Sequence, residues 1–168
     1  MKNREGQRKL VGACFKSLDQ ARELIEAEPD YLSYQDVAGE TAFHYVVVEN
    51  RLDLAQFLLA AGSDIDKADY FGATPLMHAV MLDHRELIKW LIEKGASLEA
   101  KNINGETALC WATKNDRAWA FKFLIGHPRK HPIDFYYDDL SAQDVYEDEE
   151  LVMRNHLIQL GLTRRYDY

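Results

Sequence analysis

The chain is poor in the residues and patterns that mark several classes of protein. Its 168 residues include only two cysteines, Cys14 and Cys110, which are too few for a disulfide framework. No stretch approaches the roughly 18 consecutive apolar residues of a membrane span, so we expect no membrane association. Basic residues are outnumbered, with 20 Lys and Arg against 28 Asp and Glu, and the net charge of −8 argues against nucleic-acid binding.

Motifs of enzymes and cofactor sites are also missing. The chain has no GxxxxGK phosphate loop, no GxGxxG segment after a strand and no GxSxG turn around a nucleophilic serine. His127 and His131 have the four-residue spacing of a helical metal pair, but Pro128 lies between them and no third ligand is near in sequence. We therefore predict a non-catalytic protein with no catalytic residues, no cofactor and no metal site.

The N-terminal segment, MKNREGQRKLVGAC, carries charges and lacks the apolar stretch of a secretory signal. Together with the low cysteine count, this predicts a cytoplasmic protein whose two thiols are small buried hydrophobes. Hydrophobic residues make up 47% of the chain and charged residues 29%, which is typical of a folded globular protein.

What the chain does have is an internal repeat with a constant period. The segments DVAGETAFHYVV, DYFGATPLMHAV and NINGETALCWAT begin at residues 36, 69 and 102 and align without gaps. Their glycines, Gly39, Gly72 and Gly105, are equally spaced, and each lies in a D/N-x-x-G turn, where a positive φ costs glycine little. Such a repeat indicates stacked supersecondary units rather than one compact core.

Each unit is predicted to contain a turn, two short helices and a loop. Thr74 followed by Pro75 is typical of a helix start, because the hydroxyl accepts an unpaired N–H and proline has no N–H to lose. Gly62 and Gly95 follow apolar-periodic stretches, where helices commonly end in a left-handed residue. Stacking the units at the repeat period gives four core columns: Leu10, Phe43, Leu76 and Leu109; Ala13, Val46, Ala79 and Ala112; Leu24, Phe57, Trp90 and Phe123; Ile25, Leu58, Leu91 and Leu124.

This period and the words TAFHYVV, TPLMHAV and TALCWAT resemble the ankyrin repeat. The resemblance implies an all-α ankyrin-repeat solenoid of stacked helix-turn-helix units with short hairpin-like turns. It divides a single domain, 1–168, into a degenerate first repeat at 3–35, repeats at 36–68, 69–101 and 102–134, and a C-terminal capping unit at 138–161. His44 matches the histidine that in the family bonds between neighbouring turns, whereas Met77 and Cys110 replace it with packing.

The resemblance also implies that a protein partner binds at the turn tips and the exposed side of each first helix. Tyr70, Phe71, Met81 and Leu82 would form an apolar centre with polar rims, typical of an interaction site. Alternatively, Phe71 or Leu82 folds under and covers the turn beneath. The predicted partner-binding residues are Tyr45, Val48, Tyr70, Phe71, His78, Met81, Leu82, Lys101, Ile103, Trp111 and Lys114.

Two other roles stay open beside a general interaction module. One is an acidic inhibitor or immunity-type protein that masks a basic toxin or enzyme, and the other is a structural scaffold module. Residues 133–150 carry eight acidic residues and no Lys or Arg, whereas residues 1–17 carry five basic residues and one Glu. The acidic end favours a partner with a basic surface, and we expect the chain to be a monomer.

Overall fold

The structure is a computed structural model that describes residues 2–126, with side chains from residue 4 onward. The described helices are α1 (Lys2–Lys16), α2 (Leu18–Ala27), α3 (Ala42–Val48), α4 (Leu52–Ala60), α5 (Pro75–Met81), α6 (Arg85–Glu93), α7 (Ala108–Lys114) and α8 (Ala118–Ile125), with a 3₁₀ helix η1 (Pro29–Leu32). Every regular element in this part of the chain is a helix, so the predicted all-α class is confirmed. None of these helices is long and apolar enough to cross a membrane.

Several sequence-based predictions fall outside the described residues. These are the capping unit at 138–161, the acidic segment 133–150 and the His127/His131 pair. The first unit, by contrast, is described and differs from the later ones. Its first helix, α1, has 15 residues whereas α3, α5 and α7 have seven each, and Pro29 starts η1 in place of a glycine turn.

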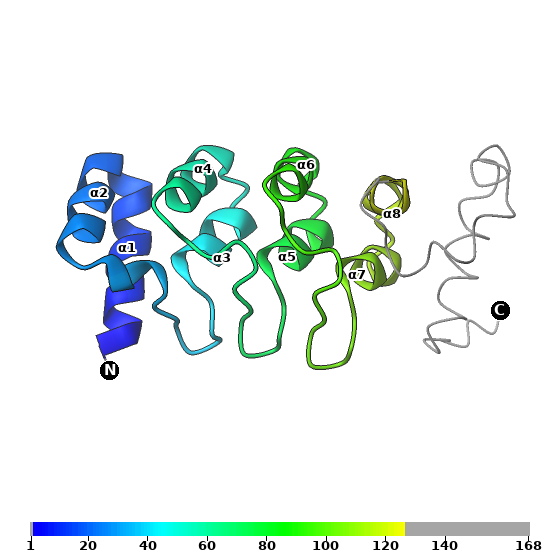
Figure 1. Ribbon diagram of the computed structural model, residues 1–168, viewed down its shortest axis with the longest axis horizontal. Coiled ribbons are helices and arrows are strands. Elements are labelled where there is room, and N and C mark those ends of the chain that lie inside the picture. The colour runs from blue at the N-terminus through cyan, green and yellow to red at the C-terminus, as the bar shows by residue number, and fades with distance from the viewer. Residues whose placement is uncertain (1, 127–168) are drawn as a thin grey trace, which may run out of the picture.

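The helices form two layers that run along one axis, so the described part of the molecule is a stack (Figure 1). The layer of α1, α3, α5 and α7 lies on the side of the long turns, and α2, α4, α6 and α8 lie above it. Within the first layer α3 packs on α1 and α5, and α5 packs on α7. Because each unit packs on its neighbours, burial depends on stacking along the whole row.

Helix boundaries follow local signals in the sequence. The Thr74 hydroxyl accepts the Met77 N–H at 3.4 Å, with Pro75 at the first helical position, as the Thr-Pro pair predicts. Asn50, Asp83 and Asp116 have positive φ values of 54°, 56° and 54° and turn the chain between paired helices. Gly62 and Gly95, with φ of 107° and 104°, follow the second helices, as predicted.

Three of the four predicted core columns are buried, and the fourth packs against them with three partly buried members. The column of Leu10, Phe43, Leu76 and Leu109 is at most 1% exposed, and the small residues Val46, Ala79 and Ala112 are fully buried between adjacent helices. In the outer layer Leu58, Leu91 and Leu124 are buried, while Leu24, Phe57 and Phe123 are partly buried against the same cluster. Both cysteines are free and buried, and burial raises the pKa of the Cys14 thiol to about 11.

Candidate functional site

Three turns of the same construction join the repeats on the side of the first helices. In each, one side-chain oxygen of the leading residue accepts two backbone N–H groups further along the turn. Asp36 accepts from Ala38 and Glu40 at 2.8 and 3.0 Å, and Asp69 accepts from Phe71 and Ala73 at 2.8 Å each. Asn102 does the same with residues 104 and 106. The leading Asp or Asn therefore sets the turn conformation from within the repeat.

The turns also bond to one another across repeats. The Tyr70 N–H donates to the Ala38 carbonyl at 2.9 Å, and the Ile103 N–H donates to the Phe71 carbonyl at 3.0 Å. Gly72 has no side chain at this contact, where a Cβ would lie 2.8 Å from the Asn102 Cα and from the Ile103 nitrogen. The turns thus form a continuous ledge, held by backbone contacts, beside the first helices.

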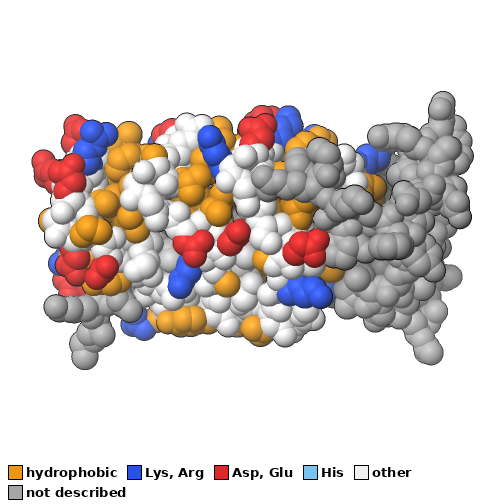
Figure 2. Space-filling model, in the orientation of Figure 1, with side chains coloured by type: hydrophobic (Ala, Val, Ile, Leu, Met, Phe, Trp, Pro, Cys, Tyr) orange, Lys and Arg blue, Asp and Glu red, His pale blue; other side chains and the backbone are white. Residues whose placement is uncertain are grey.

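The tips of this ledge expose large apolar side chains. Val37 is 63% exposed, Tyr70 63%, Phe71 60% and Ile103 70%. Figure 2 shows hydrophobic side chains along part of the lower edge, where the turns lie in Figure 1. Phe71 therefore does not fold under to cover its turn. We call Val37, Tyr70, Phe71 and Ile103 the turn-tip row.

The four residues of the predicted apolar centre fall into two groups. Tyr70 and Phe71 precede α5, whereas Met81 and Leu82 lie at its C-terminal end. The six helical residues 75–80 lie between the groups and span about 9 Å at 1.5 Å per residue. Leu82 is 37% exposed, and Met81 is half-buried like Val48 of the preceding repeat. The structure brings the turn tips of successive repeats together rather than the two ends of one helix.

Three further predicted residues, Tyr45, His78 and Trp111, form a column along the first helices. The Tyr45 hydroxyl donates to Asp36 Oδ2 at 2.9 Å, and His78 Nε2 lies 3.2 Å from Asp69 Oδ2. The rings of His78 and Trp111 meet edge-to-face with centroids 5.9 Å apart. Burial and the Asp36 hydrogen bond raise the pKa of Tyr45 to about 12. Tyr45 and His78 tie their helices to their own turns, so part of their role is structural.

The two predicted lysines differ in their surroundings. Lys101 is exposed, while Lys114 forms an ion pair with Glu106, which also accepts from Asn102 Nδ2 at 2.8 Å. Burial acts to raise the pKa of Glu106, but the bonds from Lys114 and Asn102 outweigh it and lower that pKa. The fourth repeat therefore neutralises its turn carboxylate internally.

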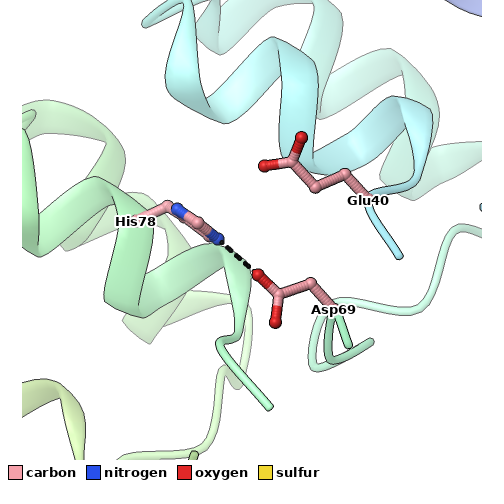
Figure 3. A group of neighbouring side chains, drawn as sticks. All are labelled: Glu40, Asp69 and His78. Atoms are coloured by element: carbon pink, nitrogen blue, oxygen red, sulfur yellow. Dashed lines mark hydrogen bonds and ion pairs between the residues drawn. The ribbon is translucent and has the colours of Figure 1, made fainter. Parts of the chain in front are cut away.

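A cluster of titratable side chains lies between the second and third repeats. One ligand atom from each of Glu40, Asp69 and His78 lies within 4.8 Å of the other two. Figure 3 shows Glu40 extending from the segment before α3 toward His78, which contacts Asp69. Burial, together with the charges of Asp36 and Asp69, raises the pKa of Glu40, while His78 opposes the shift.

Sequence reasoning selected His78 as a partner-binding residue but did not connect it with Glu40 and Asp69. The three residues come from two repeats and are 29 and nine positions apart, so no local motif links them. Only superposition of adjacent turns at the repeat period would have placed Glu40 against the following Asp69.

His44 has one role within its own repeat and faces the next turn with its other nitrogen. Its Nδ1 accepts the Thr41 N–H at 3.2 Å and so caps α3, a role that sequence reasoning did not anticipate. Its Nε2 is buried and forms no hydrogen bond with the described residues. The nearby Ala73 backbone of the next turn acts to raise the pKa of the ring. Burial and the nearby His78 lower the pKa of His44 to about 4. Met77 and Cys110, at the same position, are buried as expected.

The repeat architecture agrees with comparisons to known families. A family model described as Ankyrin repeats (3 copies) matches residues 61–135, and one described as Ankyrin repeat matches residues 38–70. No curated protein matches the chain. With these matches spanning the three repeats whose turns, caps and core columns are described above, the chain belongs to the ankyrin repeat family.

Proposed function

We propose that this chain binds a protein partner through the turn-tip row and the adjoining face of α3, α5 and α7, without catalysing a reaction. Ankyrin repeats generally serve as protein–protein interaction modules and are typically non-catalytic. The observation that carries the proposal is the exposure of Val37, Tyr70, Phe71 and Ile103, each at least 60% accessible to solvent, on adjacent turns.

The physical argument rests on the rigidity of the ledge. The turns bond to one another through the backbone, so the backbone that carries the apolar tips is held in place before a partner arrives. Little backbone entropy is then lost on binding, which raises affinity for a given contact area. Aromatic side chains that are exposed in the free protein and become buried in a complex are enriched among residues that dominate binding energy.

The test is alanine substitution in two groups, measured against the partner recovered by affinity purification. Tyr70→Ala, Phe71→Ala and Ile103→Ala are each expected to weaken the purified complex by more than about 1–2 kcal/mol, with unchanged melting temperature. Met81→Ala with Leu82→Ala tests the other end of α5 separately. Gln56→Ala, on the exposed side of α4, is the control and should bind normally. Normal binding by the Tyr70/Phe71/Ile103 triple variant would place the site elsewhere.

A second candidate is an inhibitor or immunity-type protein that masks a basic toxin or enzyme. Its support is the net charge of −8 and the eight acidic residues within 133–150. Electrostatic steering makes association fast and strongly salt-dependent. An association rate constant that does not change with ionic strength would therefore count against this role. The proposal also takes the protein to be a cytoplasmic monomer; self-association on a sizing column would instead favour a scaffold module.

A further inference from the structure

The Glu40 carboxylate lacks the partner that its counterpart has. In the fourth repeat, Glu106 pairs with Lys114 eight residues later. In the second repeat, the position eight residues after Glu40 is Val48, which offers no charge. Among the described residues, no hydrogen bond reaches the half-buried Glu40 carboxylate, and only its backbone N–H and carbonyl are bonded, both to Asp36. The second repeat therefore leaves an anionic group on this face uncompensated.

The two other members of the cluster are held in fixed orientations. Asp69 uses Oδ1 to accept two backbone N–H groups, which directs Oδ2 toward His78. The His78 ring packs edge-to-face between His44, at 5.7 Å, and Trp111, at 5.9 Å. The side chains of Asp69 and His78 are only 4% and 12% exposed. Donor atoms fixed by such supporting contacts are the preorganised shell that a metal ion requires.

The cluster is not a general consequence of the repeat. One repeat further along, the positions of Glu40, Asp69 and His78 are held by Ala73, Asn102 and Trp111, which do not supply a comparable set of ligands. Stability of the stack can therefore be achieved without these three side chains, and their convergence belongs to the boundary between the second and third repeats.

We propose that the Glu40 carboxylate, Asp69 Oδ2 and His78 Nε2 bind a divalent transition-metal ion, of which Zn²⁺ fits the donor set best. One imidazole nitrogen with two carboxylates suits zinc more than calcium or magnesium, which prefer oxygen ligands alone. The two carboxylates balance the charge of the ion. Binding takes the place of the proton between His78 Nε2 and Asp69 Oδ2, so the bound ring keeps its remaining proton on Nδ1 and any second proton is released to solvent.

The geometry needs one adjustment. Ligand atoms around tetrahedral zinc lie about 3.3 Å apart for bonds of about 2.0 Å, close to the 3.2 Å between His78 Nε2 and Asp69 Oδ2. The three ligand atoms of the cluster lie within 4.8 Å of one another, a limit that is wider than zinc requires. The Glu40 side chain therefore swings inward on binding, and no hydrogen bond from the described residues restrains its carboxylate. The fourth position stays open to water.

The experiment is titration of the full-length, untagged chain with Zn²⁺ by calorimetry, with Co²⁺ absorption as a second readout. All proteins carry His127→Gln and His131→Gln, so that neither of these histidines contributes to the signal. Glu40→Gln removes one ligand, and His78→Tyr substitutes the residue that the second repeat has at the same position, Tyr45. Glu106→Gln, at the position of Glu40 in the fourth repeat, is the matched control.

We expect one Zn²⁺ per chain, weakened at least about tenfold by Glu40→Gln and by His78→Tyr and unchanged by Glu106→Gln. Mg²⁺ and Ca²⁺ should not compete at equal concentration. Without metal, Glu40→Gln should melt no lower than its parent, because it removes a negative charge beside Asp36 and Asp69, so a lost signal cannot be attributed to unfolding. No zinc uptake, or equal uptake by the parent and Glu40→Gln, would overturn the proposal, and neither result depends on the protein partner.

Discussion

Replacing Gly72 or Gly105 by alanine separates the conformational cost of a turn from the cost of its contact with the next turn. Both glycines have φ of 76° and occupy the same place in the turns of successive repeats. A Cβ on Gly105 meets no atom of the described residues within 4 Å. A Cβ on Gly72 would lie 2.8 Å from both Asn102 Cα and the Ile103 nitrogen, which are backbone atoms that no rotamer change can move.

The magnitudes follow from these two situations. Gly105→Ala is expected to lower the free energy of unfolding by about 1–2 kcal/mol, because a residue with a Cβ must then adopt the left-handed conformation. Gly72→Ala adds the same cost, about 1–3 kcal/mol of overpacking, and about 1 kcal/mol for the bond from the Ile103 N–H to Phe71. The expected destabilisation is about 3–6 kcal/mol for Gly72→Ala, so that the two variants differ by about 2–4 kcal/mol.

The assay is urea unfolding of the full-length protein, followed by far-ultraviolet circular dichroism, for the parent and both variants. If the dependence of the unfolding free energy on urea concentration is the same in all three proteins, the shift in midpoint measures the change in stability. If the two variants lose equal stability, the turns do not press against each other as the structure places them. The rigidity assigned to the turn-tip row would then fail with that result.

The remaining predictions concern single groups, each tested by unfolding. Because the pKa of buried His44 is about 4 when folded against 6.5 as its ordinary value, the unfolded chain takes up a proton first. The free energy of unfolding is therefore unaffected by protonation of His44 above pH 6.5 and falls by up to about 3 kcal/mol as the pH falls toward 4. The unfolding midpoints at pH 7 and pH 4.5 should differ more in the parent than in His44→Gln. Parallel plots of midpoint against pH for the two proteins would contradict this. Thr74→Ala should cost about 1 kcal/mol in a urea titration through loss of the helix cap, and an unchanged midpoint would refute the capping role. Asp66→Ala should cost about 1–2 kcal/mol in the same titration, because Asp66 accepts the Ser97 N–H of the next repeat at 2.8 Å. Asp64→Ala, whose side chain bonds within its own loop, should cost a few tenths, and equal losses would exclude an inter-repeat role.

Much of the fold was predictable because its signals are local and repeat. Thr74 and Pro75 start α5, Gly62 and Gly95 follow the ends of α4 and α6, and a fixed period then places equivalent apolar residues in one column. Phe43, Leu76 and Leu109 are buried for this reason. The capping role of His44 was not predicted, because a family pattern gives the residue and not the partner of each ring nitrogen, and here Nδ1 caps α3.

The candidate site was predictable only in part. Tyr70, Phe71 and Ile103 were selected as turn-tip positions, and their solvent exposure agrees with that placement, though their role in binding stays a prediction. The cluster of Glu40, Asp69 and His78 was not anticipated, because its members are brought together only when one turn stacks on the next.

By itself the sequence determined the unit: where each turn, cap and helix lies and which side chains point into the core. These properties depend on backbone preferences and apolar spacing within a single repeat. Tertiary structure alone decided which groups meet between units, including the bond from the Tyr70 N–H to the Ala38 carbonyl and the carboxylates gathered around His78. The reason is physical, since contacts across repeats depend on side-chain direction and on the distance between stacked turns, neither of which is encoded within a single unit.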